Sequence, residues 1–102
     1  AVIANGEYQG DIVNDDTDRT MNVSILNATV KGVITDAYIS LEGSRWTAAG
    51  DSSVCLVGDV KETQIDAPAG VTVSAVAGEG CGLQGEYVLA SGGKLLVSEG
   101  SV

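Results

Sequence analysis

A five-residue pattern with glycine at its centre and an apolar residue at each end occurs four times in this chain. The copies lie at 8–12, 30–34, 56–60 and 83–87, with their glycines at positions 10, 32, 58 and 85. Successive glycines are therefore 22, 26 and 27 residues apart. A repeat of this length indicates a solenoid, in which each repeat is one coil stacked on the next. In an extended segment the two flanking residues point to one face, and glycine leaves space between them.

Short alternating segments separated by turns fill the interval between the glycines. Residues 21–25 and 71–75 alternate apolar and polar side chains, which is typical of a strand with one buried face. Runs such as 42–44 and 67–70 carry the glycine, proline and small residues of turns. Three strands of ordinary length plus their turns fill a coil of 22–27 residues. The sequence thus predicts an all-β fold, a parallel β-solenoid of about four triangular coils.

Parallel stacking places equivalent residues of successive coils over one another, so the repeat also predicts which side chains meet. Two apolar ladders are expected, the first made of Val30, Leu56 and Leu83 and the second of Ile34, Val60 and Tyr87. The alternative fold is an antiparallel β-sandwich, which also has short strands at regular spacing. A sandwich, however, gives no reason for a five-residue pattern to return once per coil.

Composition limits the partners of the chain more than it limits the fold. The 102 residues are expected to form a single domain, and repeat-like sequence at both ends suggests a fragment of a longer protein. The net charge is −9 and histidine is absent, so nucleic acid and anionic membranes are improbable partners. No apolar run reaches the roughly 20 residues of a membrane span, and membrane insertion is not expected.

Residues 39–54 carry a resemblance to known proteins. Here a hydrophobic strand is followed by a small polar turn, then Ser44-Arg45-Trp46, then Gly50-Asp51-Ser52 before the next strand. This order resembles β-helix regions of bacterial surface and secreted proteins, such as autotransporter passenger domains and adhesin-like repeats of gut bacteria. The resemblance extends loosely over residues 39–102. It implies a right-handed parallel β-helix at or outside a bacterial cell, acting as a stalk or an adhesive surface. The two cysteines depart from the usual composition of such passengers.

Four carboxylates are concentrated near the N-terminus, at Asp11, Asp15, Asp16 and Asp18. Carboxylate oxygens are ligands that Ca²⁺ prefers. Their spacing matches neither the EF-hand loop nor the glycine-rich calcium repeat, because Thr17 and Arg19 intervene. A solvated acidic loop is therefore favoured over a weak calcium site, and no other cofactor is expected.

The two cysteines, Cys55 and Cys81, are 26 residues apart, which is about one predicted coil. Neighbouring strands bring Cα atoms to about 5 Å, which is within disulfide range. The cysteines are expected either to form a disulfide between adjacent coils or to remain as two buried thiols. Without histidine, the chain cannot assemble a zinc site from nitrogen and sulfur ligands.

Catalysis is not expected. Triads of serine or cysteine with histidine are excluded, because the chain has no histidine. Asp59 and Glu86 each follow a repeat glycine and are the candidate pair for polysaccharide cleavage, although a solvated acidic face is favoured. Trp46 is a candidate platform for a sugar, against the alternative of a core or edge position. The alternative function is therefore a carbohydrate-binding or polysaccharide-degrading β-helix.

The sequence as a whole predicts a non-catalytic, extracellular structural or adhesive module whose partner is a protein or glycan at a cell surface. Each end of a solenoid exposes unpaired backbone groups over an apolar core. The chain shows no amphipathic helix at either terminus that would cap these ends. End-to-end self-association is therefore expected, unless the terminal coils are distorted to hide their edges.

Overall fold

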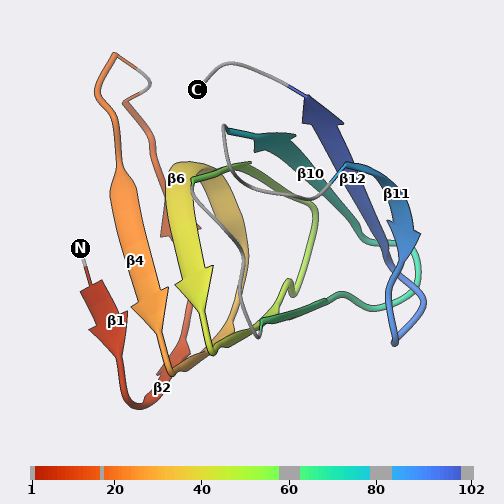
Figure 1. The fold of residues 1–102 in the computed structure, drawn as a ribbon, viewed down its shortest axis with the longest axis horizontal. Coiled ribbons are helices and arrows are strands. Elements are labelled where there is room, and N and C mark those ends of the chain that lie inside the picture. The colour runs from red at the N-terminus through yellow and green to blue at the C-terminus, as the bar shows by residue number, and fades with distance from the viewer. Residues whose placement is uncertain (1, 17, 58–62, 79–83, 100–102) are drawn as a thin grey trace.

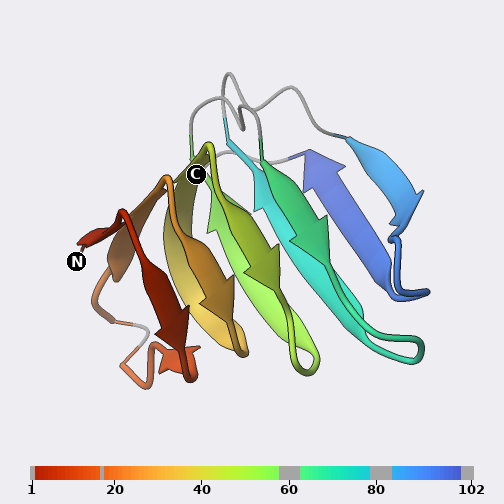
Figure 2. The ribbon, with the colours of Figure 1, turned by 90° about the horizontal axis from the view of Figure 1, so that it is seen from below.

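The computed structural model describes residues 2–16, 18–57, 63–78 and 84–99, and these form a solenoid of β-strands (Figure 1). The strands, in chain order, are β1 (Val2–Ala4), β2 (Glu7–Gln9), β3 (Ile12–Val13), β4 (Asn22–Leu26), β5 (Thr29–Lys31), β6 (Ile34–Glu42), β7 (Arg45–Thr47), β8 (Ser52–Leu56), β9 (Gln64–Asp66), β10 (Thr72–Ala77), β11 (Gly85–Val88) and β12 (Lys94–Glu99). Seen from below, strands of successive coils lie side by side from the N-terminal coil to the C-terminal one (Figure 2).

The strands form two sheets. Sheet A contains β1, β4, β6, β8, β10, β12 and β11 in spatial order, with β3 paired to β6, and sheet B contains β2, β5, β7 and β9. Every pairing between named strands is parallel except that of β11 with β12. The chain winds between the two sheets through about four turns, so the predicted all-β parallel solenoid is confirmed.

A left-handed residue turns the chain from sheet A to sheet B in three successive coils. Asn5 (φ 57°), Asn27 (φ 49°) and Gly43 (φ 56°) each follow directly on a strand of sheet A. These three residues are in register, because Ala4 pairs with Leu26 and Leu26 with Glu42. Asparagine and glycine are the residues that adopt this conformation most readily. The corner is thus encoded locally, by residue type rather than by packing.

Stacked apolar side chains fill the space between the sheets. Sheet A contributes the inward ladders Val23–Ile39–Leu56–Ala77 and Ala37–Val54–Ala75–Val97. Sheet B contributes Tyr8–Val30–Trp46–Ile65. The two predicted ladders are therefore wrong, because Val30 and Leu56 belong to different sheets. Tyr87 likewise does not stack on Ile34, since it lies on the antiparallel strand β11 and is exposed. Val60 and Leu83 are outside the described residues.

The coils are shorter and more variable than predicted. In sheet A, in-register partners on adjacent coils are 22, 16, 17, 21 and 22 residues apart, as given by Val2 with Ser24, Ser24 with Ser40, Tyr38 with Cys55, Cys55 with Val76, and Val76 with Ser98. The physical reason is the missing third strand. Beyond sheets A and B the described residues show only the short pairing of β3 with the start of β6, and not three strands in each coil.

The repeat glycines form a column over a single step. Gly10 and Gly32 are stacked, and a Cβ atom built on Gly32 would lie 1.9 Å from the Gly10 carbonyl oxygen. On its other side Gly32 meets the segment after β7, because its N–H donates to the Thr47 carbonyl at 3.0 Å. Gly85 has open space around it on β11, and Gly58 is outside the described residues. The 22-residue interval is therefore a true coil, whereas the 26- and 27-residue intervals are not strand register.

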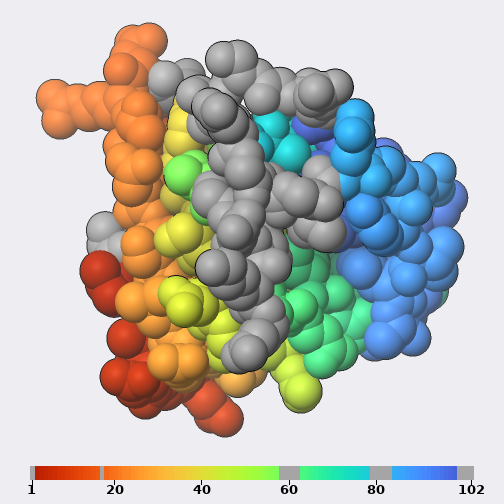
Figure 3. Space-filling view, in the orientation of Figure 1, coloured from red at the N-terminus to blue at the C-terminus, as the bar shows by residue number. Residues whose placement is uncertain are grey.

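The two ends of the solenoid differ. At the C-terminal end, β11 folds back antiparallel along β12 and covers the outer edge of that strand. At the N-terminal end, β1 and β2 are edge strands of their sheets. These ends lie on opposite sides of the molecule (Figure 3). The expectation of end-to-end association assumed two open ends, and that assumption holds at the N-terminal one. No helix capable of spanning a membrane is present in the described part of the chain.

Candidate functional site

The outer face of sheet A carries small hydroxyl side chains on successive strands. Alternation along each strand directs apolar residues to the core and leaves serine outside, at positions 24, 40, 53, 74 and 98. Ser24 and Ser40 are in register, and the Ser40 hydroxyl donates to the Ser24 oxygen at 3.3 Å. The result is a flat surface with hydrogen-bonding groups at the spacing of the strands, about 4.8 Å.

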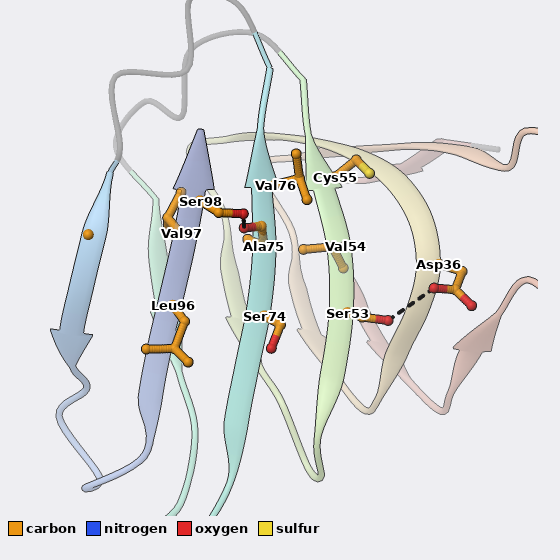
Figure 4. Close-up of a pocket in the computed structure, with 11 residues that line it drawn as sticks. Asp36, Ser53, Val54, Cys55, Ser74, Ala75, Val76, Leu96, Val97 and Ser98 are labelled. Atoms are coloured by element: carbon orange, nitrogen blue, oxygen red, sulfur yellow. Dashed lines mark hydrogen bonds between the residues drawn. The ribbon is translucent and has the colours of Figure 1, made fainter. Parts of the chain in front are cut away.

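A shallow groove of about 490 Å³ crosses this face over β8, β10 and β12 (Figure 4). Val76 and Leu96 supply apolar surface, and Ser53 and Ser74 supply hydroxyl groups. Asp36, beside the groove, accepts a hydrogen bond from the Ser53 hydroxyl at 3.2 Å. Asp36 has φ of 55° and lies where the β6–β8 register shifts, so a bulge in β6 places its carboxylate there. The groove combines an apolar floor with one carboxylate, which suits binding better than proton transfer.

Cys55 lies on the same face, at the margin of the groove. Burial, and secondarily the Asp36 carboxylate, raise the pKa of its thiol above the ordinary value. The thiol therefore stays protonated at neutral pH and is a poor nucleophile. In the next coil its in-register partner is Val76, so the predicted stacking of Cys55 on Cys81 is wrong as a statement of strand register. Cys81 lies outside the described residues, and the disulfide itself stays a prediction.

A second cleft, of about 540 Å³, opens where the chain enters sheet B. Arg45 and Gln64 lie in register on the outer face of this sheet, with Thr29 on the other side of Arg45. Asn27 and Thr63 complete the polar lining. A guanidinium, amides and hydroxyls are the donors and acceptors that match the hydroxyl groups of a sugar. This cleft is the most polar surface that the described residues enclose.

Asp66, at the end of β9, holds the turn that follows β11. The Ser91 hydroxyl donates to Asp66 Oδ2 at 2.6 Å and the Ser91 N–H donates to Oδ1 at 2.9 Å. These two bonds, the hydroxyl first, lower the pKa of the Asp66 carboxyl below its ordinary value. Charged acceptors form the stronger hydrogen bonds, so ionised Asp66 fixes the turn to β9.

Asp66→Asn should remove a pH-dependent part of the stability. Because the pKa of this carboxyl is lowered on folding from an ordinary value of 3.8, its contribution is present above that value. It is lost as the pH falls through the lower pKa of the folded state. The difference in melting temperature between wild type and variant should therefore be largest at pH 5–7 and shrink toward pH 2–3. Asp15→Asn is the matched control, because Asp15 is exposed and forms none of the described hydrogen bonds. An equal difference at every pH would contradict this role for Asp66.

Trp46 is not a surface platform for sugars. Its side chain is fully buried between Val30 and Ile65 in the sheet B ladder. The indole N–H donates to the carbonyl oxygen of Gly32 at 3.1 Å. The single tryptophan of the chain is thus the largest core side chain, and its polar atom satisfies a buried backbone group. The hypothesis of a carbohydrate contact at Trp46 is wrong for this physical reason.

The acidic N-terminal residues are held by internal hydrogen bonds. Asp11 accepts from the Val33 N–H at 3.0 Å, and Asp16 lies 3.7 Å from the Arg19 guanidinium. Buried Asn14 organises the loop, because its amide donates to the carbonyls of Arg19 and Asp36. Asp15 and Asp18 are exposed on this loop. In the described part of the chain no three carboxylates or thiols form a group that could hold a metal ion, so the calcium hypothesis gains no support.

The candidate catalytic pair is not formed by strand stacking. Glu86 lies on antiparallel β11 and forms an exposed ion pair with Lys94 at 3.6 Å. Asp59 lies outside the described residues. The sequence argument missed the groove of sheet A and the cleft around Arg45. The alternation of serine with apolar residues in 52–56 and 72–77 is the signal that could have indicated the outer hydroxyl face.

Comparison with known proteins gives no family for this chain: no family model, no curated protein and no solved structure matches it.

Proposed function

We propose that this chain is a non-catalytic structural or adhesive module that acts at or outside a bacterial cell surface. The observation that carries the proposal is the division of labour between the two sides of each strand. Inward residues build continuous apolar ladders, and outward residues of sheet A present small polar groups in register over several coils. A rigid, regularly spaced surface of this kind suits attachment to an extended partner.

The chemistry of the described side chains supports binding over catalysis. The carboxylate beside the groove, Asp36, is engaged with Ser53, and the thiol of Cys55 is held protonated. Glycoside cleavage needs two carboxyl groups that face one cleft. Asp36 is the one carboxylate among the described residues that line the groove, and the Arg45 cleft is lined by cationic and neutral polar residues.

The test is incubation of the purified chain with acidic and neutral polysaccharides, followed by assays for new reducing ends and for unsaturated products. We expect neither to form, even at long incubation and high protein concentration. Product release by the wild-type chain would contradict the non-catalytic role and would favour a polysaccharide-degrading module.

A second candidate function, carbohydrate binding, is favoured by the polar cleft around Arg45. A glycan array separates it from a purely structural role. If the cleft binds sugars, Arg45→Ala should abolish binding, because it removes the central donor group of the cleft. Lys31→Ala is the matched control, since Lys31 is an exposed cation of sheet B that does not line the cleft. Equal loss in both variants would indicate attraction by charge and not a sugar site.

A further inference from the structure

The N-terminal end of the solenoid is an open apolar cleft of about 370 Å³. Its lining includes Ile3 from β1, Tyr8 from β2, Ile12 from β3 and Met21 before β4. Tyr8 is 38% exposed, whereas Val30 and Trp46, which continue its ladder, are fully buried. The inward ladder of sheet B therefore ends with an uncovered aromatic side chain.

The backbone of β2 is also open at this edge. The Thr29 N–H donates to the Gly6 carbonyl at 2.9 Å, and the Gly10 N–H donates to the Lys31 carbonyl at 3.0 Å, so Gly6 and Gly10 point toward β5. Alternate residues of a strand direct their backbone groups to opposite edges, so those of Glu7 and Gln9 point away from the sheet. Such an edge is a template for the addition of a strand.

The charge around this end is strongly acidic. Glu7, Asp11, Asp15, Asp16 and Asp18 carry five carboxylates in the first coil. The positive charge among the described residues of this coil is Arg19, which lies against Asp16. An occupant with basic side chains is therefore favoured by charge.

A second copy of the chain fits this end poorly. Two N-terminal ends facing each other would bring like charges together. The C-terminal end offers no matching free edge, because β11 covers β12 and the Gly93 N–H donates to the Ala67 carbonyl beside β9 at 2.9 Å. The asymmetry of the two ends thus points to a different protein chain.

We propose that the N-terminal end of the solenoid binds an extended, basic amphipathic segment of another protein, which adds as a strand to the outer edge of β2. Its apolar residues would cover Tyr8 and the cleft, and its alternate lysine or arginine residues would lie beside Glu7. This site is separate from the outer faces of the sheets, so its failure would leave the proposed scaffold role untouched.

The probe is a fluorescein-labelled peptide of about ten residues in which valine and lysine alternate, a length that matches the edge and its flanking turns. Two reference peptides are used: one with glutamate in place of every lysine, and one with the same composition in two blocks. Anisotropy titration against the 102-residue chain should show binding of the alternating lysine peptide. Both reference peptides should bind at least about tenfold more weakly, since one reverses the charge and the other loses alternation.

Protein variants test the edge directly. Gln9→Pro removes a backbone N–H that points away from the sheet and should weaken peptide binding at least about tenfold. Glu7→Lys should weaken binding at least about fivefold, whereas Glu42→Lys, the same charge change on β6, should alter it less than about twofold. Circular dichroism and melting temperatures check that each variant folds.

Three results would overturn the proposal. The first is an alternating lysine peptide that fails to bind at about 1 mM, which is the weakest affinity of practical interest. The second is equal binding by wild type, Gln9→Pro and Glu7→Lys. The third is sedimentation of the chain alone as a dimer that Gln9→Pro converts to monomer, because a second copy would then occupy the edge.

Discussion

Replacing Trp46 by alanine should lower the free energy of unfolding by about 3–5 kcal/mol, the range typical of truncating a large buried aromatic residue. Trp46 is the largest fully buried side chain, and it lies between Val30 and Ile65 in the central ladder of sheet B. Removal leaves a cavity in the middle of a stack whose members contact only adjacent coils, so neighbouring coils have little means to fill it. Urea denaturation followed by circular dichroism measures the change.

Trp46→Phe separates packing from hydrogen bonding in this prediction. Phenylalanine keeps most of the apolar volume but removes the N–H that donates to Gly32. We expect a loss of about 1–3 kcal/mol, set by the buried carbonyl that loses its donor together with a smaller cavity. A loss below about 0.5 kcal/mol for Trp46→Ala, the range of surface substitutions, would mean that the indole is at the surface.

Gly32→Ala should destabilise the chain by at least about 2–3 kcal/mol, at the upper end of ordinary overpacking. The added Cβ would lie 1.9 Å from the Gly10 carbonyl oxygen and 2.6 Å from the Gly10 carbonyl carbon. Both are backbone atoms, so the first two coils must separate to admit the methyl group. Separation would also weaken the Gly10 N–H bond to the Lys31 carbonyl. The same denaturation experiment provides the value.

Gly6→Ala is the matched control for the Gly32 substitution. The nearest non-adjacent atom to a Cβ at Gly6 is the Ala4 carbonyl oxygen at 3.9 Å, an ordinary contact. Its effect should stay within about 0.5 kcal/mol, as for other surface substitutions. If Gly6→Ala and Gly32→Ala were equally destabilising, loss of glycine flexibility and not the close approach of the coils would be the cause.

Strands and their parallel stacking could be predicted because they depend on local patterns. Alternation in 21–25 and 71–75 predicted the strands that the structure has as β4 (Asn22–Leu26) and β10 (Thr72–Ala77). The 22-residue repeat predicted the stacking of Gly10 and Gly32, where a backbone contact requires glycine. In both cases the residue type reports a constraint that acts within one strand or between two adjacent coils.

The coil lengths and the site could not be predicted, because they depend on where the chain omits a strand. Nothing in the local pattern of residues 34–42 shows that β6 runs from the short pairing with β3 into the pairing with β4. That continuity shortens the coil to 16 residues and moves Leu56 to a different sheet from Val30. The burial of Trp46 has the same origin, since an isolated tryptophan between polar residues looks alike on either face of a strand.

Sheet A keeps its register although its in-register partners are separated by as few as 16 and as many as 22 residues. The difference is taken up in the connections, such as the loop at 14–20 that Asn14 holds against Arg19 and Asp36. Length changes there leave the spacing of the outer side chains at the fixed strand separation of about 4.8 Å. Evolution can therefore lengthen or shorten such a coil independently of its displayed surface. For protein engineering, the same loop is a natural insertion point for a foreign recognition sequence.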